Sequence, residues 1–205
     1  LGPKQIRHPS YHELSYLHPH YFTPDSSVLD FIGVEKGEKY VILRFISWDA
    51  FHDTGHSGLT LELKRKSVKE LSKYAKVLIS SESELPNDLK KYQINIPPER
   101  MHDVLHFSSL YFGESGTMAV ESALLGTPSV RISSLSKLLG NFQELKKKYA
   151  LIDFFEDGEL ALNKALGLIS RPESKQQWQK KAEKVFNDKI DFTKFLVDFI
   201  EKYEQ

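Results

Sequence analysis

The first feature of this sequence whose residue types could carry out chemistry is a glycine-rich turn between an aromatic run and an apolar helical stretch. It lies in "YFGESGTMAVESALLGTPSVRI", residues 111–132. Gly113 and Gly116 allow the backbone to turn sharply and to approach a ligand closely. Ser115, Thr117 and the first amides of the following helix, including that of Met118, can donate hydrogen bonds to phosphate oxygens. The turn therefore predicts an anion site, for which a diphosphate is the natural ligand.

Glu121 follows Thr117 by four residues and hence lies about one turn further along the same helix face. A carboxylate does not bind phosphate, but it can accept hydrogen bonds from the two hydroxyls of an attached ribose, as acidic residues do in dinucleotide sites. A purely structural alternative stays open. In that alternative, the glycines serve tight packing and Glu121 lies in solvent.

A second polar segment, "RFISWDAFHDTGHSGL", follows the first predicted strand and carries Arg44, Asp49, His52, Asp53 and His56. Because the ends of parallel strands meet at one edge of a sheet, this segment is expected at the same edge as the glycine turn. An imidazole with a pKa of about 6.5 can act as a general acid or base at neutral pH. We therefore assign a catalytic role to His52, with Asp53 or Asp49 orienting its ring.

Two alternatives for this segment stay open. Its histidines and carboxylates would suit zinc, manganese or iron, which predicts a metal-dependent hydrolase. It could equally be a structural loop anchored by Trp48 and Phe51. Our assignment includes no metal and no cofactor.

Short apolar runs alternate with helical patterns along the chain. Strands are predicted at 39–47, 76–82, 110–114, 127–133 and 151–155, and helices at 59–75, 98–108, 116–126, 141–150, 158–169, 172–187 and 192–203. This alternation is typical of an α/β fold with a parallel sheet flanked by helices. We expect a Rossmann-like domain over residues 40–205 that ends in a helical pair. Residues 1–39 read as an aromatic entry segment with one short helix near 26–32, packed against the domain.

Composition narrows the function classes. The 205 residues carry 28 basic and 28 acidic side chains, which argues against nucleic acid or an anionic membrane as the main partner. The chain has no cysteine, which excludes disulfides and thiolate chemistry. No apolar run approaches the roughly 20 residues that span a bilayer, and the first residues lack a signal-peptide pattern, so we expect a cytoplasmic protein. Because the sequence starts with "LGP" and not Met, we expect a piece of a longer chain.

The segment "GESGTMAVESALLGTPSV" (Gly113–Val130) resembles the nucleotide-sugar-binding motif of GT-B-fold proteins, including UDP-N-acetylglucosamine 2-epimerases and the peptidoglycan N-acetylglucosaminyltransferase. Together with "YHELSYL" and "RFISWDAFHD", in that order, it resembles the carboxyl half of domain-of-unknown-function family 354, whose members have a GT-B-like architecture. These motifs span residues 11–130. The first contains Tyr11, Glu13 and Tyr16, whose roles the resemblance leaves open.

The resemblance implies the C-terminal domain of a two-domain protein that binds the nucleotide, with an acceptor groove completed by an absent N-terminal domain. By position, Ser115, Gly116 and Thr117 match the phosphate-contacting turn, and Glu121 matches the ribose-binding glutamate. Arg44, His52 and His56 are candidate diphosphate contacts by position. The epimerases carry a second glycine where this chain has Thr117, and "HDTGH" lacks their "HRREN"-like segment, which argues against an epimerase reaction.

The function predicted from these features is binding of a nucleotide sugar, UDP-sugar-like, or of a nucleoside diphosphate by half of a glycosyltransferase or related sugar-nucleotide enzyme. The fragment alone is expected to be inactive. The alternative from another class is a non-catalytic nucleotide-responsive or scaffold domain. Arg131, in the fourth predicted strand, is a further candidate to face the cleft. For the histidines outside the His52 segment we expect surface or packing roles; they are His8, His12, His18, His20, His102 and His106.

Overall fold

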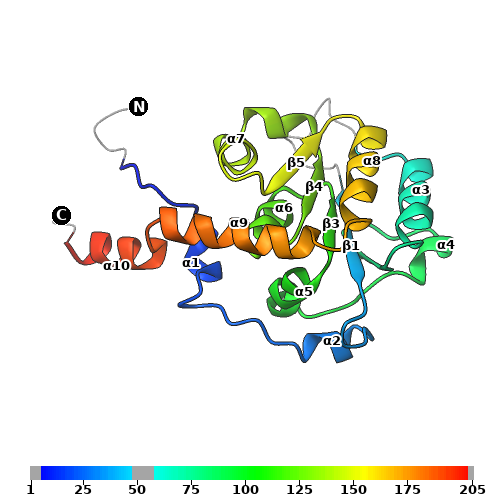
Figure 1. Ribbon diagram of the computed structural model, residues 1–205, viewed down its shortest axis with the longest axis horizontal. Coiled ribbons are helices and arrows are strands. Elements are labelled where there is room, and N and C mark those ends of the chain that lie inside the picture. Colours follow the sequence, from blue (N-terminus) through cyan, green and yellow to red (C-terminus); the bar gives the residue numbers. More distant parts are fainter. Residues whose placement is uncertain (1–5, 48–57, 203–205) are drawn as a thin grey trace.

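The computed structural model describes residues 6–47 and 58–202, and its centre is a five-stranded sheet in which all paired strands are parallel. The order across the sheet is β2-β1-β3-β4-β5 (Figure 1). The strands are β1 (Tyr40–Phe45), β2 (Lys76–Ser81), β3 (Leu110–Gly113), β4 (Ser129–Ile132) and β5 (Ile152–Phe155). The predicted α/β fold with a parallel sheet is confirmed.

Helices cover both faces of the sheet. In Figure 1, α3 (Leu61–Leu71) and α8 (Gly158–Ile169) lie on one face and contact each other. The other face carries α5 (Met101–Phe107), α6 (Gly116–Leu124) and α7 (Gly140–Lys147). The predicted C-terminal pair is present as α9 (Ser174–Asp188), which packs on α6, and α10 (Phe192–Lys202). Short turns complete the fold: α1 (Leu14–Leu17), α2 (Val28–Phe31), α4 (Asn87–Lys90), η2 (Pro98–Arg100) and η3 (Ser134–Leu138).

The elements around the glycine turn are buried on nearly all sides. Five of the six residues of β1 are buried, as expected for a strand between two helical layers. Seven of the nine residues of α6 are buried as well, because α5, α9 and the sheet surround this helix. Gly126 ends the helical stretch with a φ of 72°, a left-handed conformation that favours glycine. The predicted helix stop at this residue is confirmed.

The aromatic entry segment contributes to the same hydrophobic core as the sheet. Its buried core residues are Tyr11, Leu14, Leu17, Val28 and Val34. The Tyr11 hydroxyl donates to Glu144 of α7 at 2.8 Å, and the single turn α1 contacts α10. The sequence predicted only one helix in this segment, near α2. A four-residue turn such as α1 carries too little periodicity to be recognised.

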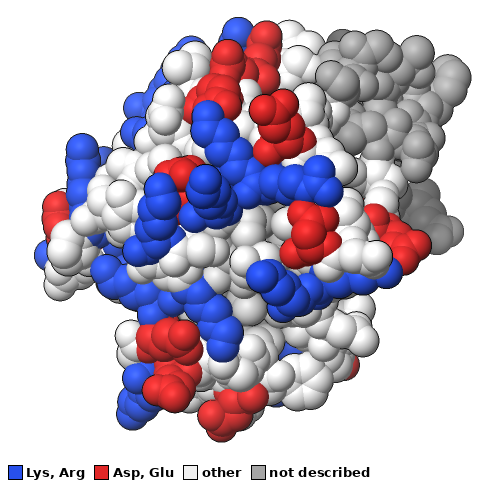
Figure 2. All heavy atoms as spheres, turned by 90° about the vertical axis from the view of Figure 1, so that its right-hand side faces the viewer, with Lys and Arg blue, Asp and Glu red and all other residues white. Residues whose placement is uncertain are grey.

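Charged side chains of both signs share the face that carries α3 and α4 (Figure 2). Acidic residues lie among the basic ones there, and three ion pairs join them: Arg65–Asp88, Lys66–Glu159 and Lys90–Glu84. This face therefore presents mixed charge. Within residues 6–47 and 58–202, no helix is long and apolar enough to cross a membrane.

The strand order creates a topological switch point between β1 and β3. The chain leaves β1 toward β2 on one side and then places β3 on the opposite side of β1. In open α/β sheets with this order, ligands bind in the crevice beyond the carboxyl ends of the two central strands. Arg44 and Gly113 are register partners at these ends, and Arg131 is paired with Gly113 from β4.

Candidate functional site

The glycine turn forms the N-terminus of α6 at the switch point. Ser115 is the N-cap residue, and its hydroxyl accepts a hydrogen bond from the Met118 amide at 3.4 Å. The Met118 amide is therefore occupied, which corrects the prediction that it donates to a ligand. The amides of Gly116 and Thr117 lie in the first turn, where no intrahelical acceptor exists, and Thr117 is exposed. Because the Ser115 oxygen acts as acceptor in the cap, its own O–H remains able to donate.

The two glycines of the turn serve different purposes. A Cβ atom on Gly113 would lie 2.5 Å from the carbonyl oxygen of Arg44, so this glycine permits the close approach of β3 to β1. A Cβ atom on Gly116 would lie 3.2 Å from the guanidinium carbon of Arg131. Tight packing, the structural alternative from the sequence, thus explains Gly113. Gly116 leaves room for the Arg131 guanidinium to pack against the start of α6.

Arg131 places a positive charge directly behind the turn. Its side chain donates to the Glu114 carbonyl oxygen at 3.1 Å and to the Ser136 hydroxyl at 3.0 Å, and its guanidinium lies 4.7 Å from the centre of the Phe142 ring. The residue is 7% exposed, and burial lowers the pKa of its guanidinium. No carboxylate in the described ranges forms an ion pair with it. Its charge adds to the positive end of the α6 dipole.

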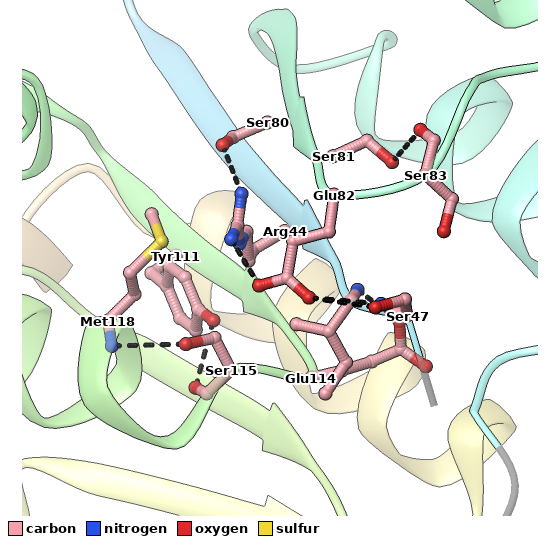
Figure 3. A network of polar contacts seen from close by, with 11 residues as sticks. Arg44, Ser47, Ser80, Ser81, Glu82, Ser83, Tyr111, Glu114, Ser115 and Met118 are labelled. Atoms are coloured by element: carbon pink, nitrogen blue, oxygen red, sulfur yellow. Dashed lines mark hydrogen bonds and ion pairs between the residues drawn. The ribbon is translucent and has the colours of Figure 1, made fainter. Parts of the chain in front are cut away.

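Arg44 lies close to this turn, but its guanidinium is directed toward β2 (Figure 3). It donates to the Ser80 hydroxyl at 2.8 Å and forms an ion pair with Glu82. Glu82 also accepts a hydrogen bond from the Ser47 amide at 3.1 Å. The charge of Arg44 is therefore largely neutralised, and the described geometry does not bring it together with Ser115.

Glu121 is 6% exposed, so the alternative that places it in solvent is wrong. Its Oε1 atom accepts a hydrogen bond from the Tyr16 hydroxyl and lies within hydrogen-bonding distance of His102 Nε2, both at 3.0 Å. The two rings stack with centroids 5.3 Å apart. Burial and the Glu121 carboxylate raise the pKa of Tyr16, which keeps the phenol protonated as a donor. A surface or packing role was predicted for His102, but its side chain contacts Glu121, the carboxylate predicted to bind the ribose.

The "YHELSYL" motif thus acquires a structural role. Tyr16 reaches Glu121, and Glu13 is a second buried carboxylate, 2% exposed. Burial raises the pKa of Glu13, and the nearby Glu121 charge contributes in the same direction. The motif therefore contacts α6 through Glu121.

Glu114 is the residue of this site that the sequence did not identify. Its fully buried carboxylate accepts hydrogen bonds from the Ile46 amide at 3.2 Å and the Leu59 amide at 2.6 Å. These amides flank residues 48–57. An acidic residue at the end of an otherwise apolar buried strand was the available signal. The predicted catalytic residues His52 and Asp53, with Asp49 and His56, lie outside the described residues.

No protein-family model and no curated protein matches this chain. Solved structures do. The wall teichoic acid polymerase TagF matches with a TM-score of 0.53 and 14% identity over 93% of this chain and 48% of that one. The spinosyn rhamnosyltransferase SpnG, complexed with spinosyn aglycone, matches with a TM-score of 0.54 and 10% identity over 84% of this chain and 47% of that one.

The Streptomyces sp. SF2575 glycosyltransferase SsfS6, complexed with thymidine diphosphate, matches with a TM-score of 0.54 and 12% identity over 89% of this chain and 47% of that one. At such identities the similarity concerns the fold, which is that of the C-terminal domains of GT-B glycosyltransferases, as predicted. The chain spans about half the length of these structures. The resemblance to family 354 stays a prediction.

Proposed function

We propose that this chain binds the diphosphate of a nucleotide sugar, or a nucleoside diphosphate, at the β3–α6 turn, as half of a GT-B-like glycosyltransferase or related sugar-nucleotide enzyme. One observation carries the proposal. The buried guanidinium of Arg131 packs against Gly116 at the N-terminus of α6, at the switch point, without an ion-pair partner among the described carboxylates. A buried charge in that position calls for an anion.

The donors around the turn fit a diphosphate. Ser115 supplies a hydroxyl, Gly116 and Thr117 supply amides, and Arg131 with the helix dipole supplies positive potential. In glycosyl transfer the leaving group is a nucleoside diphosphate, whose negative charge grows in the transition state. Preorganised donors at that position lower the barrier electrostatically. Catalysis by His52 and Asp53 remains part of this proposal.

Glu121 is proposed to bind the ribose. It follows Gly116 by five residues, which corresponds to about 7.5 Å along the helix axis, a distance suited to the step from phosphate to ribose. Tyr16 and His102 both bond to Oε1 and so fix the orientation of the carboxylate. The solved neighbours support the ligand class, since SsfS6 is complexed with thymidine diphosphate. Because the chain spans half of these neighbours, we propose that a second domain completes the acceptor side.

Replacing Ser115 by Ala tests the phosphate contact. We expect nucleoside diphosphate affinity, measured by isothermal titration calorimetry with UDP, TDP and CDP, to fall by about tenfold, because one hydrogen bond to a charged group is lost. The matched control is Asp157→Ala, which removes the N-cap of α8. Both variants should lose about 1 kcal/mol of unfolding free energy, but only the first should lose affinity. Absence of binding to the unmodified protein at millimolar nucleotide would refute the proposal and favour a scaffold domain.

Glu121→Gln tests the ribose contact separately. We expect UDP to bind about tenfold more weakly, whereas inorganic pyrophosphate, which has no ribose, should bind as before. The control is Glu144→Gln, since Glu144 also accepts a tyrosine hydroxyl, that of Tyr11, but lies on α7. An equal loss for both ligands would contradict the assignment of ribose to Glu121.

A further inference from the structure

Three metal-ligating side chains converge where the entry segment meets the α9–α10 junction. They are His18, His20 and Asp191, and one ligand atom from each lies within 4.8 Å of the others. It is the one such group of three among residues 6–47 and 58–202. The two histidines are separated from Asp191 by about 170 positions in the sequence, so the fold alone creates this cluster.

The donor types match a zinc site, and so does the distance between two of the three ligands. Two imidazoles and one carboxylate, with a water in the fourth position, form a common Zn²⁺ coordination set. Two ligands about 2 Å from a tetrahedral ion lie roughly 3.3 Å apart. The distance between His20 Nδ1 and Asp191 Oδ2 is 3.3 Å. His20 is 69% exposed, so an ion and its water can enter from solvent.

Neighbouring contacts hold Asp191 and the two segments that carry the ligands in place. The Tyr21 hydroxyl donates to both carboxylate oxygens of Asp191, at 3.1 and 2.9 Å. The His20 amide donates to His18 Nδ1 at 3.3 Å, so His18 coordinates an ion only when this bond opens or when its Nε2 proton is released. Further bonds join the same two segments, from Ser10 to the Ile190 carbonyl and from Thr193 to the Ser15 carbonyl. Supporting bonds of this kind orient the ligands in metal sites.

We propose that His18, His20 and Asp191 bind a divalent zinc ion that joins the entry segment to the start of α10. The ion replaces the direct contact between His20 and Asp191 with two coordinate bonds, and His18 supplies the third. The site is separate from the β3–α6 turn, so it does not rest on the proposed nucleotide function. It adds a structural link between the two terminal segments of the described chain.

Titration of the metal-free protein with Zn²⁺ near neutral pH tests the proposal. We expect one Zn²⁺ per chain at this site and an increase in thermal midpoint on addition of the metal. His20→Ala and His18→Ala should each weaken Zn²⁺ binding at least about tenfold and abolish the thermal shift. Asp191→Asn should also weaken it while keeping the cap that Asp191 gives to the Lys194 amide.

Two controls identify the site. His12→Ala removes an exposed histidine of the same segment and should leave Zn²⁺ binding unchanged. The double variant His52→Ala, His56→Ala removes the other candidate donors and should also retain it. In the presence of EDTA, all variants should melt close to the unmodified protein. Zn²⁺ binding that is absent at millimolar concentration, survives loss of His18 and His20, or disappears with His52 and His56 overturns the proposal.

Discussion

Gly113→Ala is expected to reduce the unfolding free energy by about 3 kcal/mol, the upper part of the range for overpacking. The added Cβ atom would lie 2.5 Å from the Arg44 carbonyl oxygen and 2.9 Å from the Arg44 amide nitrogen. Both atoms belong to the backbone of β1 and cannot move aside without breaking the β1–β3 register. Urea unfolding followed by circular dichroism measures the change.

Gly167→Ala is the matched control for that experiment. Gly167 lies inside α8 and is exposed, and a Cβ atom added to it would have no neighbouring atom within 4 Å. Alanine there should raise the unfolding free energy by about 0.5 to 1 kcal/mol, because glycine is a poor helix former. If the two variants shift stability equally, the close approach of β3 to β1 does not explain Gly113.

The unfolding free energy is expected to rise with pH between about 7 and 9 because of Lys175. Its amine is enclosed and donates to the His106 carbonyl and the Thr127 hydroxyl, and burial lowers its pKa to about 7. In this pH range the unfolded chain keeps the lysine proton and the folded chain does not. The slope is at most about 1.4 kcal/mol per pH unit, so the gain over the interval is roughly 2 kcal/mol.

Lys175→Met should flatten this pH dependence, whereas Lys180→Met, an exposed lysine of the same helix, should preserve it. Below pH 7 a different group dominates this region. Burial and the Lys175 charge lower the pKa of His106 to about 4. The contribution of His106 to the unfolding free energy is complete above the pKa of this residue in the unfolded chain. It is lost as the pH falls from about 6.5 to 4, because the unfolded chain then binds a proton at His106 that the folded chain does not. Urea titrations at a series of pH values separate the two effects, and an unchanged slope in Lys175→Met contradicts the assignment.

Much of the fold was predictable because its signals are local. The buried run that forms β1 and the stop at Gly126 depend on residues adjacent in sequence. The turn at Ser115 likewise follows from a capping residue next to glycine. A capping residue beside glycine at the end of a predicted strand therefore located the turn and the helix start from the sequence alone, whereas the phosphate contacts proposed there stay a prediction.

The partners of the site were not predictable because they come from distant segments. Tyr16 is 105 residues away from Glu121, and no spacing rule connects them. Arg131 was a candidate from the sequence to face the cleft, but its contact with Gly116 could not be predicted, because only the β3–β4 register places it behind the turn. Arg44 was expected to contact a diphosphate, but it forms an ion pair with Glu82, which follows the edge strand β2. Long-range pairing therefore decided which side chains face one another.

Glu114 gives the switch point a further property. Since one carboxylate accepts hydrogen bonds from the amides of both Ile46 and Leu59, it joins the end of β1 to the start of the α3 region. A Glu114→Ala substitution would take the acceptor from both backbone amides at once, so the position of these two segments beside the switch point depends on a single side chain.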